Sequence, residues 1–184
     1  MATLLKPSSP AADNLTALFA PGSVAVIGAS SDQRRFGGRP IQYLLEAGFE
    51  GPVYPVNPGR PEIQGLTAYP SILDVPGPVD CAILAISADA TQQTIDDCIA
   101  RGVKSAVLYG AGFSETGEEG RARQDRIVAT AREAGMRLLG PNCMGLMNTH
   151  ARFYGTFASA LEEGVPAPGR IAVASQSGGY GGYL

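Results

Sequence analysis

Residues 23–38 read SVAVIGASSDQRRFGG, and this stretch decides the fold. Its first part, Ser23–Ile27, is an apolar run that ends in Gly28, which is typical of a strand buried on both faces of a parallel sheet. A glycine-rich loop then reaches Gly38. Pro40 suits the first turn of a helix, because the N–H that proline lacks would have no partner there. A strand, a glycine-rich loop and a helix in this order predict the first unit of an α/β sheet.

The same alternation of strand and helix continues along the chain. Further strands are predicted at residues 53–56, 80–86, 103–109 and 136–139. Pro55 interrupts the first of these strands and indicates a place near the edge of the sheet. Strands joined by helical crossovers predict a Rossmann-like, doubly wound parallel sheet with flanking helices, which binds ligands at the carboxyl ends of its strands.

The helices between these strands are predicted from their apolar spacing and end signals. A short helix is expected at 13–19, and others begin near Pro40, near Asp89 and after Thr116. Thr116–Glu119 has the pattern of a capping box. The apolar faces that we expect to be buried are Ile41, Leu44 and Leu45, then Ile95, Cys98 and Ile99, then Ile127, Ala131 and Ala134, with Arg123, Asp125, Arg126 and Arg132 facing water.

The ends of the chain differ in composition from its middle. Residues 1–12 (MATLLKPSSPAA) predict a disordered lead, and residues 13–163 are expected to form the Rossmann-like domain. The stretch 164–170, which contains GVPAPG, predicts a linker. Ile171–Ala174 is a further apolar run that predicts a strand, and a glycine-containing loop follows it. Residues 171–184 therefore indicate the start of a truncated second domain.

Composition excludes several classes of protein. The net charge of −3 is unsuited to nucleic acid as the main partner, since phosphate backbones need a basic face. No apolar run approaches the roughly 20 residues of a membrane span, and the N-terminus lacks the pattern of a signal peptide, so we expect a cytoplasmic protein without a membrane partner. Three cysteines and one histidine at no ligand spacing argue against a metal site and predict buried thiols in a reducing compartment.

The glycine-rich loop carries the main chemical signal. Gly28, Ala29, Ser30, Gly37 and Gly38 allow close approach of backbone N–H groups to a phosphate, and the helix that follows presents its positive end. The loop lacks the G-x-G-x-x-G spacing of dinucleotide-binding enzymes, and a solvated surface loop is the alternative.

The residue after the second strand bears on the choice of nucleotide. NAD enzymes usually place Asp or Glu there, to hold the ribose hydroxyls. This chain has the neutral Asn57, which disfavours NAD and leaves other adenine nucleotides open, although Asn57-Pro58 is also a common turn.

Five segments together carry a family resemblance. They are Ser23–Ser30 (SVAVIGAS), Tyr54–Pro58 (YPVNP), Ala111–Phe113 (AGF), Gly140–Gly145 (GPNCMG) and Ser175–Gly178 (SQSG). Their order and spacing resemble the nucleoside-diphosphate-forming acid–CoA ligases, the superfamily of ADP-forming acetyl-CoA synthetase and succinyl-CoA synthetase. The resemblance covers roughly residues 15–184. It implies an N-terminal CoA-binding domain, followed by flavodoxin-like domains and an ATP-grasp module in the same protein or a partner subunit.

The resemblance also implies roles for particular residues toward CoA or acyl-CoA. The loop from Gly28 to Gly38 would meet the CoA phosphates, and Val56 and Asn57 would lie near the adenosine. Ile86, Ser87 and Ala88 would line the pantetheine path, although many relatives have proline at the position of Ser87. Gly140, Pro141 and Asn142 would lie near the thiol. The cations that we consider for the 3′-phosphate are Arg34 and Arg35 first, with Arg39, and Arg60 further off.

Catalysis in this superfamily passes through an acyl phosphate and a phosphohistidine. His150, the only histidine, matches no such motif, and Cys143 lacks a nearby base, so no catalytic residue is predicted in this chain. Thus the chain is expected to bind CoA without completing the ligase reaction. The alternatives are a CoA-binding regulatory domain, the front end of a protein acetyltransferase and, less favoured, an NAD(P)-dependent oxidoreductase.

Overall fold

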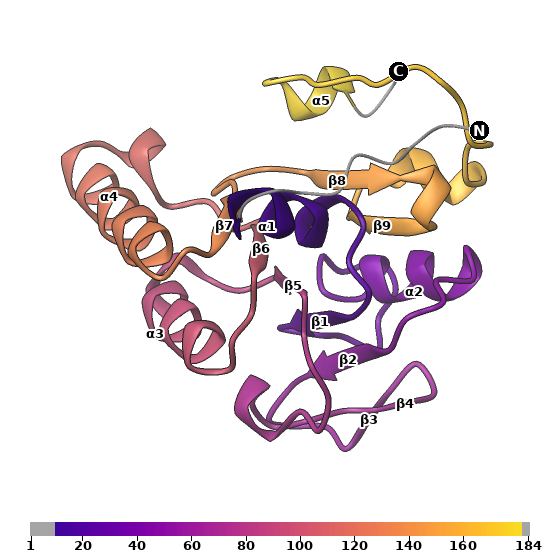
Figure 1. Ribbon diagram of the computed structural model, residues 1–184, viewed down its shortest axis with the longest axis horizontal. Helices are drawn as coiled ribbons and strands as arrows, with labels where there is room; N and C mark the ends of the chain where they lie inside the picture. Colours follow the sequence, from indigo (N-terminus) through magenta and orange to yellow (C-terminus); the bar gives the residue numbers. More distant parts are fainter. Residues whose placement is uncertain (1–9, 182–184) are drawn as a thin grey trace.

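The computed structural model describes residues 10–181. Their centre is a five-stranded parallel sheet of order β2-β1-β5-β6-β7, which confirms the Rossmann-like α/β fold (Figure 1). The strands are β1 (Val24–Ile27), β2 (Val53–Val56), β5 (Cys81–Leu84), β6 (Ser105–Leu108) and β7 (Arg137–Leu139). All five match the predicted strands, and β2 lies at an edge as Pro55 predicts. Since β1 pairs with both β2 and β5, the chain reverses its direction of travel across the sheet at β1, and such switch points open a crevice for ligands.

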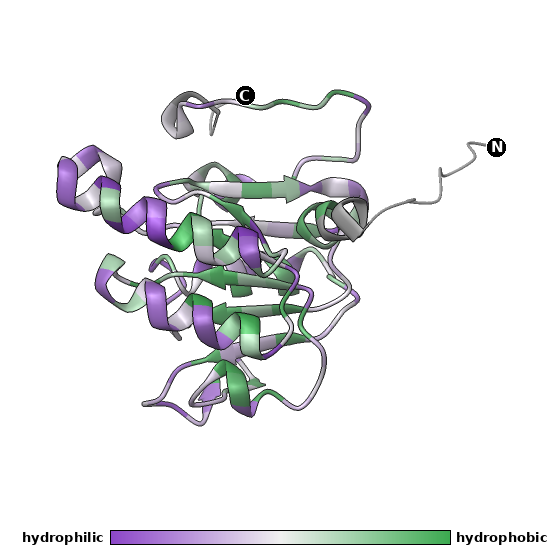
Figure 2. Ribbon diagram, turned by 60° about the vertical axis from the view of Figure 1, so that its left-hand side comes forward, coloured by the Kyte–Doolittle hydropathy of each residue, from purple (hydrophilic) through white to green (hydrophobic). Residues whose placement is uncertain are grey.

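Helices cover both faces of the sheet. Alternate side chains of each strand point to opposite faces, so Ala25 and Leu84 pack toward α3 (Ala88–Ala100) and α4 (Glu118–Glu133). Val26 and Ile83 pack toward α1 (Pro10–Phe19) and α2 (Arg39–Glu46). Burial on both faces explains why the strands are apolar without alternation. Figure 2 shows these hydrophobic strands between helices whose outer surfaces are hydrophilic.

Two antiparallel hairpins were not predicted. The first, β3 (Glu62–Ile63) with β4 (Leu66–Thr67), lies in the crossover from β2 to β5, where the described chain has a 3-10 turn at Ile72–Asp74 and no α-helix. The second, β8 (Gly145–Asn148) with β9 (Phe153–Thr156), packs beside α2 through the buried ring of Phe153. Strands of two to four residues carry too little periodicity to be recognised in sequence.

The predictions for α1 and α2 need one correction each. The helix α1 begins at Pro10, so residues 10–12 are helical and only 1–9 of the expected disordered lead lie outside the described residues. In α2, Leu45 is 44% exposed and Tyr43 is buried instead. The Tyr43 hydroxyl donates a hydrogen bond to the Ala158 carbonyl oxygen at 3.0 Å, which satisfies its polar end within the core.

The helix α4 departs from prediction at both ends. Its N-cap is Gly117, and the hydroxyl of Thr116 donates to the Phe113 carbonyl oxygen at 2.8 Å, so the capping box does not form. Arg123 is partly buried and contacts Asp89 at 3.2 Å and the Gly112 carbonyl oxygen at 3.0 Å, rather than water alone. At the other end Ala134 follows the helix and is exposed. Ile127 and Ala131 are buried as predicted.

The predicted strand at 171–174 is absent from the structure. Ile171 is 90% exposed and Val173 is 61% exposed, and no described segment pairs with their backbone. An apolar run forms a strand only when a sheet edge supplies hydrogen bonds, which explains the difference. The segment ends in the short helix α5 (Gly178–Gly181). Among the described helices, none is long and apolar enough to cross a membrane.

Candidate functional site

The segment from Gly28 to Gly38, here called the glycine loop, leaves the carboxyl end of β1 and leads into α2. Gly28 has a φ of 81°, and a side chain there would overlap the Ala85 carbonyl oxygen at the end of β5. Gly37 lies against Gly28 so closely that a Cβ atom on Gly37 would overlap the Gly28 carbonyl oxygen. The loop therefore closes on itself, and the glycines are required by contact as well as by conformation.

A cavity of about 760 Å³ opens beside this loop. We call it the loop cleft. The predicted site residues that line it are Gly28, Ala29, Ser30, Arg34, Arg35, Gly37 and Asn57. Ser31, Asp32, Phe36, Arg60 and Ala85 complete the lining. Ala85 follows β5 and Asn57 follows β2, so the cleft lies at the carboxyl ends of three adjacent strands, where α/β sheets bind ligands.

The remaining predicted residues do not line the loop cleft. Gly38 is the N-cap of α2, and Val56 is buried at the end of β2. Ile86, Ser87 and Ala88 follow β5, and Gly140, Pro141 and Asn142 follow β7. These last two segments approach one another at Gly110, whose carbonyl oxygen accepts a hydrogen bond from Asn142 N–H at 2.9 Å. They form a second group at the same edge of the sheet.

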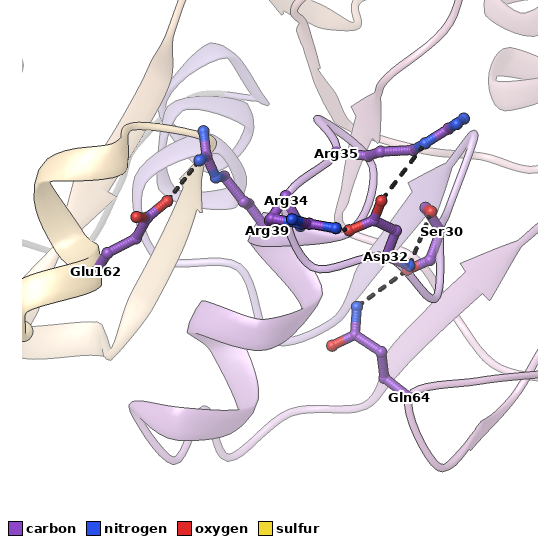
Figure 3. A network of polar contacts seen from close by, with 7 residues as sticks. All are labelled: Ser30, Asp32, Arg34, Arg35, Arg39, Gln64 and Glu162. Carbon is purple, nitrogen blue, oxygen red and sulfur yellow. Dashed lines mark hydrogen bonds and ion pairs between the residues drawn. The ribbon is translucent and has the colours of Figure 1, made fainter.

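Asp32 holds two of the candidate arginines (Figure 3). Its carboxylate lies 3.5 Å from Arg34 Nε and 3.8 Å from Arg35 Nε, and it accepts the Arg34 backbone N–H at 3.0 Å. That backbone N–H is the main reason why the pKa of Asp32 lies below its usual value, and both guanidinium groups lower it further. Both arginine side chains are more than three-quarters exposed, so they are free to reorient toward an anion.

Two further arginines have different surroundings. Arg39, another candidate cation, does not line the loop cleft: it pairs with Glu162 and donates to the Phe157 carbonyl oxygen at 3.1 Å. Figure 3 shows it pointing toward Glu162, away from Asp32. Arg60 lies in the cleft lining and forms no ion pair within residues 10–181. From the sequence, Arg60 was placed further off because the hairpin of β3 and β4 that follows it had not been recognised.

Two side-chain amides brace the glycine loop. Asn57 Nδ2 donates to the Ala29 carbonyl oxygen at 2.8 Å, and Asn57 Oδ1 accepts Gly59 N–H at 2.8 Å, so this side chain makes the expected turn and also supports the loop. Gln64, in the turn between β3 and β4, donates from Nε2 to the carbonyl oxygens of Ser30 at 3.0 Å and Gly38 at 2.9 Å. Sequence reasoning missed Gln64, because no motif links it to the loop.

The cysteines and the histidine lie outside the cleft lining. Burial raises the pKa of Cys81 and of Cys98 to about 12, so both remain thiols at neutral pH. Cys143 is partly buried, and its Sγ–H donates to the Leu108 carbonyl oxygen at 3.4 Å. His150 is exposed, with Nε2 2.8 Å from the Gly169 carbonyl oxygen. Within the described part of the chain, no three His, Cys, Asp or Glu residues are grouped as metal ligands.

Comparison with known proteins identifies the family. Residues 22–149 match the model of a CoA binding domain. Among curated proteins, the chain is 43% identical over 163 residues to the alpha subunit of acetate–CoA ligase [ADP-forming] II of Pyrococcus furiosus. It is 41% identical over 172 residues to the alpha subunit of acetate–CoA ligase [ADP-forming] I of the same organism. These alignments cover 89% and 91% of this chain but only 34% and 36% of the relatives, so the chain spans about a third of their length.

Solved structures agree with this assignment. A crystal structure of a protein from Pyrococcus horikoshii OT3 superimposes with a TM-score of 0.85 at 40% identity, covering 92% of this chain and 38% of that one. The dinucleotide forming acetyl-coenzyme A synthetase 1 of Ca. Korarchaeum cryptofilum, in complex with phosphate and ADP, gives a TM-score of 0.75 at 41% identity, covering 79% and 31%. The chain belongs to the CoA-binding domain family, and its sequence and fold are similar to this domain in the alpha subunits of ADP-forming acetate–CoA ligases.

Proposed function

We propose that this chain holds CoA or acyl-CoA for a nucleoside-diphosphate-forming acid–CoA ligase. The observation that carries the proposal is the loop cleft. It combines a closed glycine loop, the start of α2 and three arginines at the carboxyl edge of a parallel sheet. Backbone N–H groups and guanidinium groups are the donors that polyphosphates need, and a cavity of this volume is in the range of cofactor sites. The donor set therefore fits the pyrophosphate and 3′-phosphate of CoA.

The proposed ligand follows the edge of the sheet. Its pyrophosphate lies at the glycine loop, and its adenosine lies near Val56 and Asn57. Arg34 or Arg35 meets the 3′-phosphate, and Arg60 offers a third guanidinium group in the lining. The pantetheine chain runs past residues 86–88, so that the thiol ends near residues 140–142. Support for this path comes from contacts between the loops: Gly28 adjoins Ala85, and residues 86 and 142 both adjoin Gly110.

The chemical steps of the ligase are assigned to other units. In this proposal residues 13–163 form the CoA-binding domain and 164–170 a linker, while 171–184 belong to a second domain. The exposure of Ile171 and Val173 supports this division, because two large apolar side chains in water are expected to be covered in a complete assembly. Flavodoxin-like and ATP-grasp domains, in the same protein or a partner subunit, would form the acyl phosphate and carry the phosphohistidine. The thiol of bound CoA would then attack the acyl carbon of the acyl phosphate, so that the thioester forms, the thiol proton is lost and inorganic phosphate leaves.

Calorimetric titration of the 184-residue protein with CoA, dephospho-CoA and NAD tests the proposal. We expect saturable binding of CoA, weaker binding of dephospho-CoA and little binding of NAD. Arg34→Ala and Arg35→Ala are compared with Arg126→Ala, a matched control that removes an exposed arginine from α4. Binding of NAD without CoA would refute the proposed function. If neither Arg34→Ala nor Arg35→Ala narrows the difference between CoA and dephospho-CoA, their assignment to the 3′-phosphate is wrong.

A further inference from the structure

Gln64 occupies an unusual position for a residue with a long side chain. It has a φ of 52°, in the left-handed region that side chains disfavour, at the turn between β3 and β4. Gly65 follows it with a φ of 81°, so the turn bends back sharply toward the glycine loop. The side chain is partly buried and makes three hydrogen bonds to that loop: Nε2 donates to two carbonyl oxygens, and Oε1 accepts from Gln33 Nε2 at 3.5 Å. The conformation of the turn thus directs the side-chain amide of Gln64 toward the glycine loop.

The Gln64 amide contacts the glycine loop near both of its ends. The Gln64 Nε2 group donates to the carbonyl oxygens of Ser30 and Gly38, which lie eight residues apart in sequence (Figure 3 shows the bond to Ser30). An amide NH₂ group has two hydrogens, so it can serve both acceptors at once. The Ser30 backbone N–H also donates to the Gly37 carbonyl oxygen at 3.3 Å. The two ends of the loop are therefore fixed against each other, and Gln64 holds them from outside.

The bond to Ser30 also fixes the direction of the next peptide group. In a trans peptide the carbonyl oxygen and the following N–H point in opposite directions. When the Ser30 carbonyl oxygen points to Gln64, the N–H of Ser31 points away from Gln64. Ser31 is exposed and lines the loop cleft, and within residues 10–181 its N–H has no acceptor. A donor without a partner at the surface of the cleft is available to a ligand.

We propose that Gln64 is a positioning residue, which orients the Ser30–Ser31 peptide so that the Ser31 N–H donates to a phosphate of bound CoA. This inference rests on the proposed function and assigns a part of it to a residue outside the glycine loop. Gln64 itself need not touch the ligand. Its effect is to set the peptide in the binding orientation before the ligand arrives, which removes a reorganisation cost from binding.

The test uses two variants with different backbone consequences. Gln64→Asn keeps a neutral amide and tolerates the left-handed conformation, but its side chain is one methylene shorter and does not reach both carbonyl oxygens. Gln64→Gly relieves the conformation and removes the amide altogether. Gln93→Leu is the matched control, since it removes an exposed glutamine whose Nε2 bonds only to Asp97 on α3, at 2.9 Å. Affinity for CoA is measured by calorimetry, and the Ser31 amide is followed by ¹⁵N–¹H NMR during titration.

In the wild type and in Gln93→Leu, we expect the Ser31 amide proton to move downfield as CoA binds. In both Gln64 variants we expect about a tenfold loss of affinity, the effect of one hydrogen bond to a charged group, together with loss of the downfield shift. The thermal midpoint of the free protein should change little, which separates positioning from a general structural role. Unchanged affinity in both variants, or a Ser31 amide that does not respond in the wild type, overturns the inference while leaving CoA binding intact. Absence of CoA binding in the wild type refutes the proposed function itself, and the inference with it.

Discussion

Replacing Gly37 with alanine tests the closed form of the glycine loop most directly. A Cβ atom at this position would overlap the Gly28 carbonyl oxygen and lie 2.9 Å from the carbonyl carbon of Gly28 and 3.3 Å from Ala29 Cα. Ordinary van der Waals contact begins at 3.4 Å, so the carbonyl carbon alone is about 0.5 Å too close. All three neighbours are backbone atoms, which cannot rotate away as a side chain can. Either the loop opens or the start of α2 moves.

The cost follows from this geometry. Forcing one extra carbon into a packed site costs about 1–3 kcal/mol. For a chain of this size each kcal/mol lowers the thermal midpoint by about 2–4 °C, so about 2 kcal/mol corresponds to a fall of about 4–8 °C. The same displacement misplaces the N–H groups that face the loop cleft. Loss of one hydrogen bond to a charged phosphate predicts about a tenfold weaker affinity for CoA.

Thermal unfolding and calorimetric titration with CoA measure both effects on the same protein. Gly169→Ala is the control, because a Cβ atom at Gly169 meets nothing within 4 Å and the backbone there does not have a positive φ. We expect the control to match the wild type in thermal midpoint and affinity. If Gly37→Ala also matches the wild type, the loop does not close on Gly28 as described, and the explanation of the cleft by backbone contact is refuted.

Four further predictions concern Arg60, Asp32 and the two buried cysteines. Arg60→Ala should weaken the binding of CoA and of dephospho-CoA by a similar factor of about five, as measured by calorimetry, because Arg60 lines the cleft without an ion pair in the described structure and the 3′-phosphate is assigned to Arg34 or Arg35. A loss of affinity confined to CoA would move the 3′-phosphate to Arg60. Asp32→Asn should keep the turn, since an amide oxygen also accepts the Arg34 N–H, and should raise CoA affinity up to about fivefold at low salt by releasing the guanidinium groups. The pKa of Asp32 is lowered in the folded state. The stabilisation that the Asp32 carboxylate gives is therefore present above its usual pKa of 3.8 and is lost as the pH falls through the lowered pKa. The difference in unfolding free energy between the wild type and Asp32→Asn should accordingly shrink below about pH 4. Cys81 and Cys98 should not react with a thiol reagent at pH 8 in the folded protein, because burial raises the pKa of each to about 12, and rapid labelling of either would contradict their placement in the core.

The sheet was predictable from sequence because each central strand is buried on both faces. That requirement makes Val24–Ile27 and Cys81–Leu84 continuous apolar runs, bounded by turn residues, and such runs are recognisable without any knowledge of their neighbours. The glycine loop was predictable for a similar reason, since close contacts between backbone segments within the loop require glycine. Asn57 lies in the lining of the loop cleft directly after β2, and the end of that strand was recognisable from the residue pattern.

Other features depend on partners that are distant in sequence. The capping box at Thr116 failed because its hydroxyl found a closer acceptor in Phe113, and the predicted strand at 171–174 failed because no described sheet edge receives it. Arg39 follows the glycine loop directly and was therefore a candidate cation, but it pairs with Glu162, 123 residues away, and does not line the cleft. A local pattern specifies what a residue is able to bind, whereas the folded chain decides which of the available partners is near.

The five strands of the parallel sheet, the position of the glycine loop and the family resemblance follow from the sequence alone, because they depend on burial and backbone contact within short segments. Only the tertiary structure decided which cations remain available and how the loop is supported. Gln64 braces a loop 26 residues before it, and Arg60 joins the cleft from the turn after β2. Side-chain hydrogen bonds and ion pairs act only over a few ångströms. The contacts of Gln64 and Arg60 therefore form only after folding has brought the ends of the strands together.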